Sequence, residues 1–419
     1  MPVVLGDYVE LQRGTTYKSA MLGQAGPVLL GLGSIARNGG FKGNNLKTYG
    51  GPCDPRHLVR PGEIYVSLKD VTQSADLLGA VARLPPYIPL GRLTQDTVKL
   101  VFKKEDASRT YLYWLLRTPQ YREYCLAHST GTTNLGLARD DFLKFEVPPL
   151  TREREWIVRL VQTIEDKVEL NRRLNKALEG MAQAIFKDWF IDFGPTRRKI
   201  AGAVDPVAII GGLIPDAARA REITALFPDA LGDDGMPEGW REKPLDQSLI
   251  LQRGFDLPKT TRTDGCYPVI AASGPNGTHD EFKVRGPGVC TGRSGVLGGV
   301  FFVREDFWPL NTSLWIKDYP NSTPLYAFYL LRTLDLLALN GGSAVPTLNR
   351  NHVHQIPVVT PSMSVIHEFE RLVTLIYDRI GSAEAESCTL AETCDYLLPK
   401  LISGEVRVHD AEQAMAGIA

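Results

Sequence analysis

Residues 157–189 read IVRLVQTIEDKVELNRRLNKALEGMAQAIFKDW, and the spacing of side chains in this segment indicates how the chain is built. Mostly apolar side chains recur in it at alternating steps of four and three residues. The positions are Ile157, Val161, Ile164, Val168, Asn171, Asn175, Leu178, Ala182, Ile185 and Trp189. This spacing predicts a long helix that packs along its length against a second helix. Thr151 is a suitable N-cap, and Gly194 followed by Pro195 is expected to end the helix.

The same spacing returns 212 residues later in the chain. Its positions are Phe369, Val373, Ile376, Ile380, Ala383, Ser387, Leu390, Cys394, Leu397 and Leu401. Pro399 is expected to end or kink this second helix near residue 398. Polar residues in the middle of the first seam would face small residues in the middle of the second, which leaves room for their amides. We therefore predict an antiparallel coiled coil, with two unrelated surface helices as the alternative.

Three further segments occur twice and in the same order. LQRG at 11–14 recurs unchanged at 251–254, YLYWLLRT at 111–118 returns as YAFYLLRT at 326–333, and GTT at 131–133 returns as GSA at 342–344. The offset between copies shrinks from 240 to 215 to 211 residues, as deletions inside a second copy would produce. The chain is thus predicted to be an internal duplication.

Each copy places a globular block before its long helix. Both blocks contain short β-like runs separated by Gly, Pro and Asn, together with one expected helix at 109–127 or 323–339. The fold class is therefore predicted as α+β. The expected divisions are a first block at 1–150, a first long helix at 151–193, a linker at 194–240, a second block at 241–360, a second long helix at 361–403 and a C-terminal tail at 404–419.

Composition places the chain among ordinary folded proteins. Its 419 residues are 43% apolar and 23% charged, which excludes a disordered tail protein and a minimal peptide scaffold. The net charge is −1, but residues 1–199 carry an excess of eight positive charges, while acidic residues gather in 200–240 and 361–419. We expect a cytoplasmic protein without a membrane segment, because no long apolar run and no secretion signal is present.

Cysteine and histidine provide no recognisable metal site. The six cysteines form no Cys-x-x-Cys pair, which argues against a disulfide framework and against a zinc ribbon. His352 and His354 have a spacing that suits one face of a strand as well as two metal ligands, but no third ligand accompanies them. Phosphate loops, nucleotide-binding glycine motifs, nucleophile elbows and zinc-protease motifs are also missing. We therefore predict no catalytic residues, no metal and no cofactor in this chain.

Two glycine-rich stretches have side chains suited to nucleic acid. They are NGGFKGNNLK at 38–47 and TGRSG at 291–295. Glycine allows close approach to a phosphate, and Arg, Lys, Asn and Thr are the side chains that contact base edges. Composition alone does not distinguish these stretches from ordinary turns.

With the duplication laid out, the chain resembles the DNA-specificity subunits of Type I restriction-modification systems. The segments that carry the resemblance are FKDWFIDFGP at 186–195, PEGW at 237–240, TGRSG at 291–295, PTLN at 346–349 and LLPKLISGE at 397–405. The resemblance implies that each block is a target-recognition domain and that the two long helices form an antiparallel coiled coil. It also implies that each domain binds half of a bipartite target in double-stranded DNA. A helix over 155–190 would measure roughly 54 Å, which suits the gap of such a target.

The resemblance further implies partners that perform the chemistry. Two methyltransferase subunits would dock, with S-adenosylmethionine held by them and ATP held by a separate restriction subunit, whose presence stays open. Helix residues facing away from the seam, together with Trp189, Phe190 and Phe193, are our candidates for the partner surface, although Trp189 also falls on the seam.

Candidate DNA-reading residues come from the loops of the two blocks. They are Lys42, Asn45, Lys69, Asn276, Arg293 and Thr347. Arg293 has the best case because an arginine between glycines can reach guanine O6 and N7. The first block has VSLKD at 66–70 where we match CTGRS at 290–294 of the second, so the two are expected to read different half-sites.

Two other classes of function remain open. A fused enzyme with its own methyltransferase or nuclease is disfavoured by the missing motifs. A coiled-coil adaptor that binds proteins without direct DNA contact remains the alternative, since the total charge is nearly neutral.

Overall fold

The computed structural model describes residues 2–71, 74–104, 108–132, 134–341 and 344–403. Two compact units make up this part of the chain. The first unit contains the residues up to Asn171 together with those from Ala385 onward, and the second contains Arg172–Glu384. Each unit therefore combines one globular block with part of both long helices. The predicted tail at 404–419 lies outside the described residues.

The block of the first unit contains short strands and short helices. Its strands are β1 (Val9–Arg13), β2 (Val28–Leu30), β3 (Leu58–Val59), β4 (Ile64–Ser67), β5 (Lys69–Asp70), β6 (Val81–Arg83), β7 (Gly91–Leu93), β8 (Thr97–Phe102), β9 (Ser129–Thr130) and β10 (Leu135–Leu137). Its helices are α1 (Leu5–Tyr8), α2 (Arg109–Leu115), α3 (Pro119–Ala127) and α4 (Arg139–Leu143). The main sheet has the order β1-β8-β4-β6 and is antiparallel throughout.

The block of the second unit repeats this plan. Its strands are β11 (Arg241–Pro244), β12 (Ile250–Arg253), β13 (Tyr267–Ala271), β14 (Gly274–His279), β15 (Gly288–Gly292), β16 (Val300–Val303), β17 (Trp308–Pro309), β18 (Ser313–Asp318) and β19 (Pro357–Thr360), and its helices are α9 (Pro324–Thr333) and α10 (Arg350–His354). The main sheet, β12-β18-β15-β16, has the strand order of the first block and is also antiparallel. The parallel pair β2-β7 recurs as β13-β17. The structure thus confirms the α+β class and displays the duplication inferred from sequence.

The repeated LQRG segment ends in glycine because no side chain fits at that position. The N–H groups of Gly14 and Gly254 each donate a hydrogen bond of 3.1 Å to a carbonyl of the central sheet. A Cβ atom on Gly14 would lie 2.2 Å from the carbonyl oxygen of Thr94, and one on Gly254 would lie 2.3 Å from that of Leu310. The same close backbone approach therefore occurs in both blocks.

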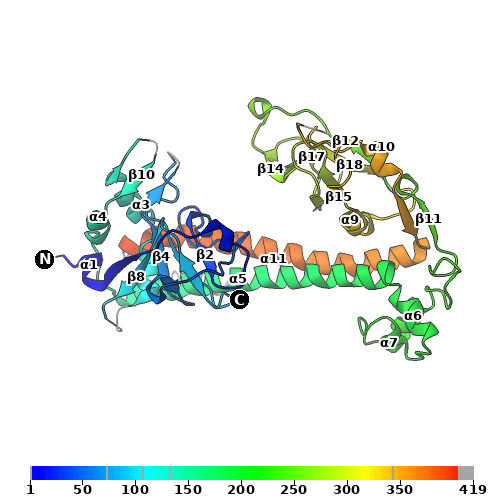
Figure 1. Ribbon diagram of the computed structural model, residues 1–419, viewed down its shortest axis with the longest axis horizontal. Coiled ribbons are helices and arrows are strands. Elements are labelled where there is room, and N and C mark those ends of the chain that lie inside the picture. Colours follow the sequence, from blue (N-terminus) through cyan, green and yellow to red (C-terminus); the bar gives the residue numbers. More distant parts are fainter. Residues whose placement is uncertain (1, 72–73, 105–107, 133, 342–343, 404–419) are drawn as a thin grey trace. The chain divides into compact units, whose positions relative to one another are not determined.

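The two long helices, α5 (Arg152–Phe186) and α11 (Met363–Ser403), run side by side within each unit (Figure 1). In the first unit the seam residues Ile157, Val161, Ile164, Leu390 and Leu397 are buried, and Val168 packs against them. Asn171 donates to Ser387 Oγ at 3.2 Å and to Glu386 Oε2 at 2.7 Å. Glu165, before Asn171 in α5, interacts electrostatically with Cys394, after Ser387 in α11. The segments of this unit are therefore antiparallel.

The second unit contains the other parts of the same two helices. Its seam residues Ile185, Phe369, Val373 and Ile380 are buried, whereas Leu178 and Ile376 are half-buried. The rings of Trp189 and Phe369 lie 6.3 Å apart, and Glu179 interacts electrostatically with Tyr377. The earlier residue Glu179 thus lies near the later residue Tyr377, and the later residue Trp189 lies near the earlier residue Phe369, so the pairing is antiparallel here too.

Three helix boundaries differ from the sequence predictions. The single helix expected at 109–127 is divided into α2 and α3, because Pro119 starts a new helix and Thr118 Oγ1 caps it by accepting from the Tyr121 amide. In the second block, α9 ends at Thr333 rather than near 339. Of the end or kink expected at Pro399, the end is wrong, because α11 continues through Pro399, whose carbonyl accepts from Gln120 Nε2 at 3.2 Å.

The predicted linker at 194–240 is a folded part of the second unit. It contains α6 (Gly194–Ile200), α7 (Pro206–Ile209) and α8 (Ala217–Thr224), of which α6 and α7 lie close together in Figure 1. Arg198 forms a two-pronged pair with Asp188, two residues after the end of α5, and Arg219 pairs with Glu368 at 2.5 Å near the start of α11. The linker thus ties the end of the first long helix to the beginning of the second.

Candidate nucleic-acid interface

A matched pair of backbone hydrogen bonds identifies equivalent positions in the two blocks. The Leu137 amide donates to the carbonyl of Leu68 at 2.9 Å, and the Leu348 amide donates to the carbonyl of Arg293 at 2.8 Å. Each bond joins the residue that directly follows a central strand to a residue two positions before a short helix. Arg293 in the second block therefore holds the position of Leu68 in the first.

The sheet register supports this correspondence and corrects the sequence match. In the first block, Gln12 of LQRG and Tyr65 both pair with Lys99 of β8. In the second block, Gln252 of LQRG and Cys290 both pair with Trp315 of β18, so Tyr65 and Cys290 are equivalent. Lys69 lies four residues after Tyr65 and Ser294 lies four residues after Cys290, so Lys69 corresponds to Ser294 rather than to Arg293. The sequence match, which aligns Lys69 with Arg293, is therefore wrong by one residue. In the structure, long-range strand pairing determines the register.

Lys69 lines a groove of about 320 Å³ in the first block. The lining side chains with charge are Arg13 at the end of β1, Lys69 in β5, Arg139 at the start of α4, and Asp96. Three cations and one carboxylate give the groove a positive balance. Arg13 Nε donates to the Gln95 carbonyl at 3.1 Å, which uses one of its five donors. The groove can therefore accept an anionic ligand such as a phosphate.

In the second block, the two motifs TGRSG and PTLN lie next to each other. Ser294 and Thr347 form an isolated β-bridge, and the Gly295 amide donates to the Pro346 carbonyl at 2.9 Å. Arg293 is half-buried, and its Nη1 donates to the Asn311 carbonyl at 3.1 Å. Two predicted DNA-reading residues, Arg293 and Thr347, are thus brought together on one pair of loops.

The remaining candidate DNA-reading residues are placed less favourably. Lys42 and Asn45 are exposed on the loop between β2 and β3, and neither lines the Lys69 groove. Asn276, in β14, accepts from Arg262 Nη1 at both its backbone carbonyl and its Oδ1, at 2.7 and 2.9 Å. Its side-chain oxygen is therefore already engaged within the block.

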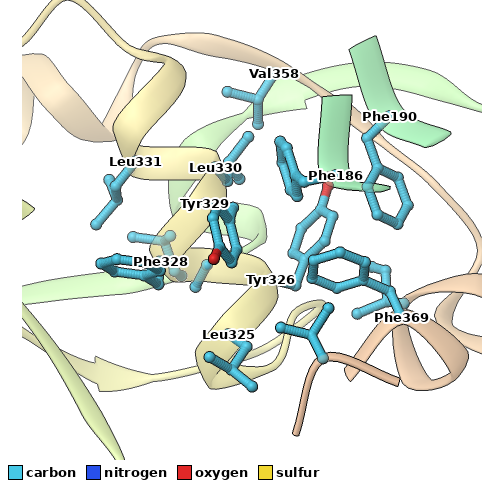
Figure 2. Close-up of a cluster of buried hydrophobic side chains, with 14 of the residues drawn as sticks. Phe186, Phe190, Leu325, Tyr326, Phe328, Tyr329, Leu330, Leu331, Val358 and Phe369 are labelled. Carbon is cyan, nitrogen blue, oxygen red and sulfur yellow. The ribbon is translucent and has the colours of Figure 1, made fainter. Parts of the chain in front are cut away.

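The predicted partner-binding aromatic residues contribute to a core instead. Trp189 and Phe190 are 0% and 4% exposed, and Phe193 is half-buried against Trp240, with ring centroids 5.7 Å apart. Figure 2 shows Phe190 beside Phe369 and near the aromatic side chains of α9. This burial argues against direct contact between a partner and Trp189 or Phe190, and their docking role stays a prediction.

One half-buried histidine and two buried cysteines have shifted pKa values. His354 lies in α10, where its Nε2 accepts from the Leu251 amide at 2.9 Å, and burial lowers the pKa of its imidazole. Burial likewise raises the pKa of Cys290, and raises that of Cys125 to about 11. Among the described residues, no three His, Cys, Asp or Glu side chains are grouped so that they could hold a metal ion. The helices of the same ranges are too short or too polar to cross a membrane.

Sequence reasoning missed four arginines that the structure places beside the candidate loops. They are Arg13, Arg139, Arg253 and Arg350. The signal was available, because Arg13 and Arg253 belong to the repeated LQRG, and Arg139 and Arg350 are separated by the same 211 residues as the GTT and GSA segments.

Comparisons with known proteins agree on one family. No family model matches the chain. The Type I restriction enzyme HindI specificity subunit of Haemophilus influenzae is 26% identical over 362 residues, which cover 71% of this chain and 77% of that protein. The MjaIX specificity subunit of Methanocaldococcus jannaschii is 21% identical over 347 residues, covering 76% of this chain and 73% of its own.

A solved structure shares the fold over nearly the whole length. It is the S subunit of a Type I restriction-modification system from M. genitalium, with a TM-score of 0.55 and 15% identity. The match covers 96% of this chain and 95% of that one. Its extent includes both globular blocks and both long helices.

Proposed function

The chain belongs to the specificity subunits of Type I restriction-modification systems, and we propose that it reads a bipartite target in double-stranded DNA. In this role it is non-catalytic and directs methyltransferase and restriction subunits to the target. One observation carries the proposal: two blocks with the same sheet order present different side chains at equivalent loop positions. A duplicated scaffold with altered loops is suited to reading two unlike half-sites.

The charge distribution is consistent with DNA contact in the first block. Arg13, Lys69 and Arg139 line one groove, and a phosphate backbone is attracted to such a site. Contacts to phosphate position a protein on DNA, while contacts to base edges supply the specificity. In this proposal the loops around Lys69 and Arg293 supply the base contacts, and the two long helices set the gap between the half-sites.

The chemistry would come from partner subunits. Two methyltransferase subunits would hold S-adenosylmethionine, and restriction subunits would use ATP. Since Trp189 and Phe190 are buried, the docking surface for the methyltransferase is better sought among exposed apolar side chains of α5. Leu170 and Met181 are each 52% exposed and meet that requirement.

A binding experiment distinguishes this function from that of a protein adaptor. The chain is co-expressed with the methyltransferase subunits of its host, and the purified complex is titrated with random-sequence duplex DNA at several salt concentrations. We expect a complex with DNA whose affinity falls steeply as salt rises. An assembled complex that shifts no DNA at low salt would favour the adaptor and contradict the proposal.

A further inference from the structure

One arginine holds the same place at the end of the first strand in each block. Arg13 precedes Gly14, whose amide donates to the Thr97 carbonyl, and Arg253 precedes Gly254, whose amide donates to the Ser313 carbonyl. Both hydrogen bonds are 3.1 Å long, and both arginines are exposed. The two side chains therefore leave equivalent points of the two central sheets.

A second arginine pair is equivalent by a separate hydrogen bond. Arg139 comes two residues after Leu137, whose amide donates to the Leu68 carbonyl, and Arg350 comes two residues after Leu348, whose amide donates to the Arg293 carbonyl. Arg139 is the first residue of α4 and Arg350 is the first residue of α10. Both arginines are exposed. Each block thus carries two arginines at matched positions that come from opposite ends of its sequence.

These arginines are not used to stabilise the fold through strong ion pairs. Within the described ranges, Arg13, Arg139 and Arg350 have no salt bridge, and the nearest carboxylate oxygen of Asp256 lies 4.0 Å from Arg253. In the first block, Arg13 and Arg139 line the same groove as Lys69. In the second, α10 contacts β12, so Arg350 and Arg253 also come from adjoining elements. Guanidinium groups gathered in this way are available to an anionic ligand.

The side chains between the two arginines differ from one block to the other. Lys69 is replaced by Ser294, Leu68 by Arg293, and Gly136 by Thr347. A phosphate backbone is the same at every sequence, whereas base edges differ. Two copies that read different half-sites should therefore keep their phosphate contacts and change their base contacts. The arrangement of shared arginines around altered loops follows that rule.

We propose that Arg13 with Arg139, and Arg253 with Arg350, are two equivalent arginine clamps that grip the DNA phosphates of the two half-sites. This inference rests on the proposed function and names its positioning residues. The loop residues between the arginines of each clamp contact the bases. The clamps therefore set affinity and salt dependence, and they leave the preferred sequence unchanged.

The test uses the complex of the chain with its co-expressed methyltransferase subunits. Four double variants are prepared: Arg13→Gln with Arg139→Gln, Arg253→Gln with Arg350→Gln, and the controls Arg37→Gln and Arg285→Gln, each combined with Lys18→Gln. Arg37 and Arg285 are exposed and lie outside the groove of the first block. Affinity for a random-sequence duplex pool is measured over a salt series, and the sequences methylated in a random library are read in parallel.

Each clamp variant should make the negative slope of log affinity against log salt shallower by about 1.8, because each of the two lost phosphate contacts accounts for about 0.9. Its methylated consensus should stay that of the wild type, and the controls should keep the wild-type slope to within about 0.9. A slope unchanged in the clamp variants, or a consensus altered in one half-site, would overturn the inference. Either result could occur while the wild type still reads a bipartite site, whereas loss of sequence preference in the wild type itself would overturn the proposed function.

Discussion

The backbone amide of Leu348 donates a hydrogen bond of 2.8 Å to the carbonyl oxygen of Arg293. This bond joins two loops that the sequence separates widely, and it places Thr347 beside Ser294. The Arg293 guanidinium is held further by its contact with the Asn311 carbonyl. A side chain fixed in this way loses little additional freedom on binding, which favours specific recognition of a base.

Replacing Arg293 with alanine should relax recognition at one base of one half-site. Loss of a two-pronged arginine contact to guanine costs about 1–3 kcal/mol of discrimination. Sequencing of methylated products from a randomised library would show this as a weakened preference at a single position. Arg285→Ala is the matched control in the same block. An unchanged preference at every position in Arg293→Ala would remove this residue from the reading surface.

The two asparagines of the first seam should respond differently to substitution. Asn171→Ala leaves Ser387 and Glu386 without their amide donor, so we expect a loss of about 1–3 kcal/mol in the free energy of unfolding. Asn175 has a buried Oδ1 without a partner among the described residues, so Asn175→Ala should be neutral or stabilising. Urea denaturation of both variants provides the comparison. Equal losses would show that the Asn171 hydrogen bonds add no stability.

Substitutions at Trp189 and at Leu170 test folding and partner docking separately. Trp189→Ala should destabilise the second unit by about 3–5 kcal/mol, because a fully buried aromatic side chain is removed. Leu170→Ser and Met181→Ser change exposed side chains, so thermal unfolding should stay close to that of the wild type. Co-purification with the methyltransferase should weaken in these two variants. Full retention of the partner in both would place the docking surface elsewhere.

The second block should lose stability on mild acidification. The neutral imidazole of His354 accepts from the Leu251 amide, and partial burial lowers the pKa of His354 from its ordinary value. The folded state therefore binds this proton less readily than the unfolded state, so stability is complete above about pH 6.5 and falls as the pH drops below it. Thermal unfolding between pH 7.5 and 5.5, a range of about two units around the histidine pKa, should show this loss in the wild type and a smaller one in His354→Gln.

His352→Asn is the control for that experiment, because His352 lies on the same short helix and is exposed. It should retain the pH dependence of the wild type. If His354→Gln lost stability with pH as the wild type does, the imidazole of His354 would not be responsible.

Two glycines offer a test of the shared sheet architecture. Gly254→Ala would place a Cβ 2.3 Å from the Leu310 carbonyl oxygen, so we expect misfolding or strong destabilisation of the second block. Gly180 lies in α5 with open space around it, and Gly180→Ala should stabilise the helix by up to about 1 kcal/mol. Circular dichroism during thermal unfolding distinguishes the two. A Gly254→Ala protein as stable as the wild type would contradict the close backbone approach.

Local and repetitive features of the fold could be predicted from sequence. The spacing of Ile157, Val161 and Ile164 predicted α5, because burial along one face of a helix repeats with the helical period. The recurrence of LQRG and the returning helix motif revealed the duplication, since one scaffold needs the same close glycine contact twice. These signals lie within short stretches of chain.

Features set by distant contacts could not be predicted in this way. The sequence match aligns Lys69 with Arg293, whereas strand pairing with β8 and β18 sets a register that differs by one residue. The burial of Phe190 depends on Trp240 and α9, which approach only in the folded second unit. Pro399 stays helical although its local preference opposes it. In each case a contact between remote segments outweighs the local signal.

The most direct test of the account is to map methylated bases across the genome of a host that carries this chain with its methyltransferase, and to repeat the map with Arg293→Ala. We predict a methylated motif made of two separated half-sites that depends on the chain, with Arg293→Ala altering one half-site and leaving the other half and the gap unchanged. A motif that is contiguous, or one that persists after the chain is deleted, would contradict the claim that the two blocks read two halves of one target.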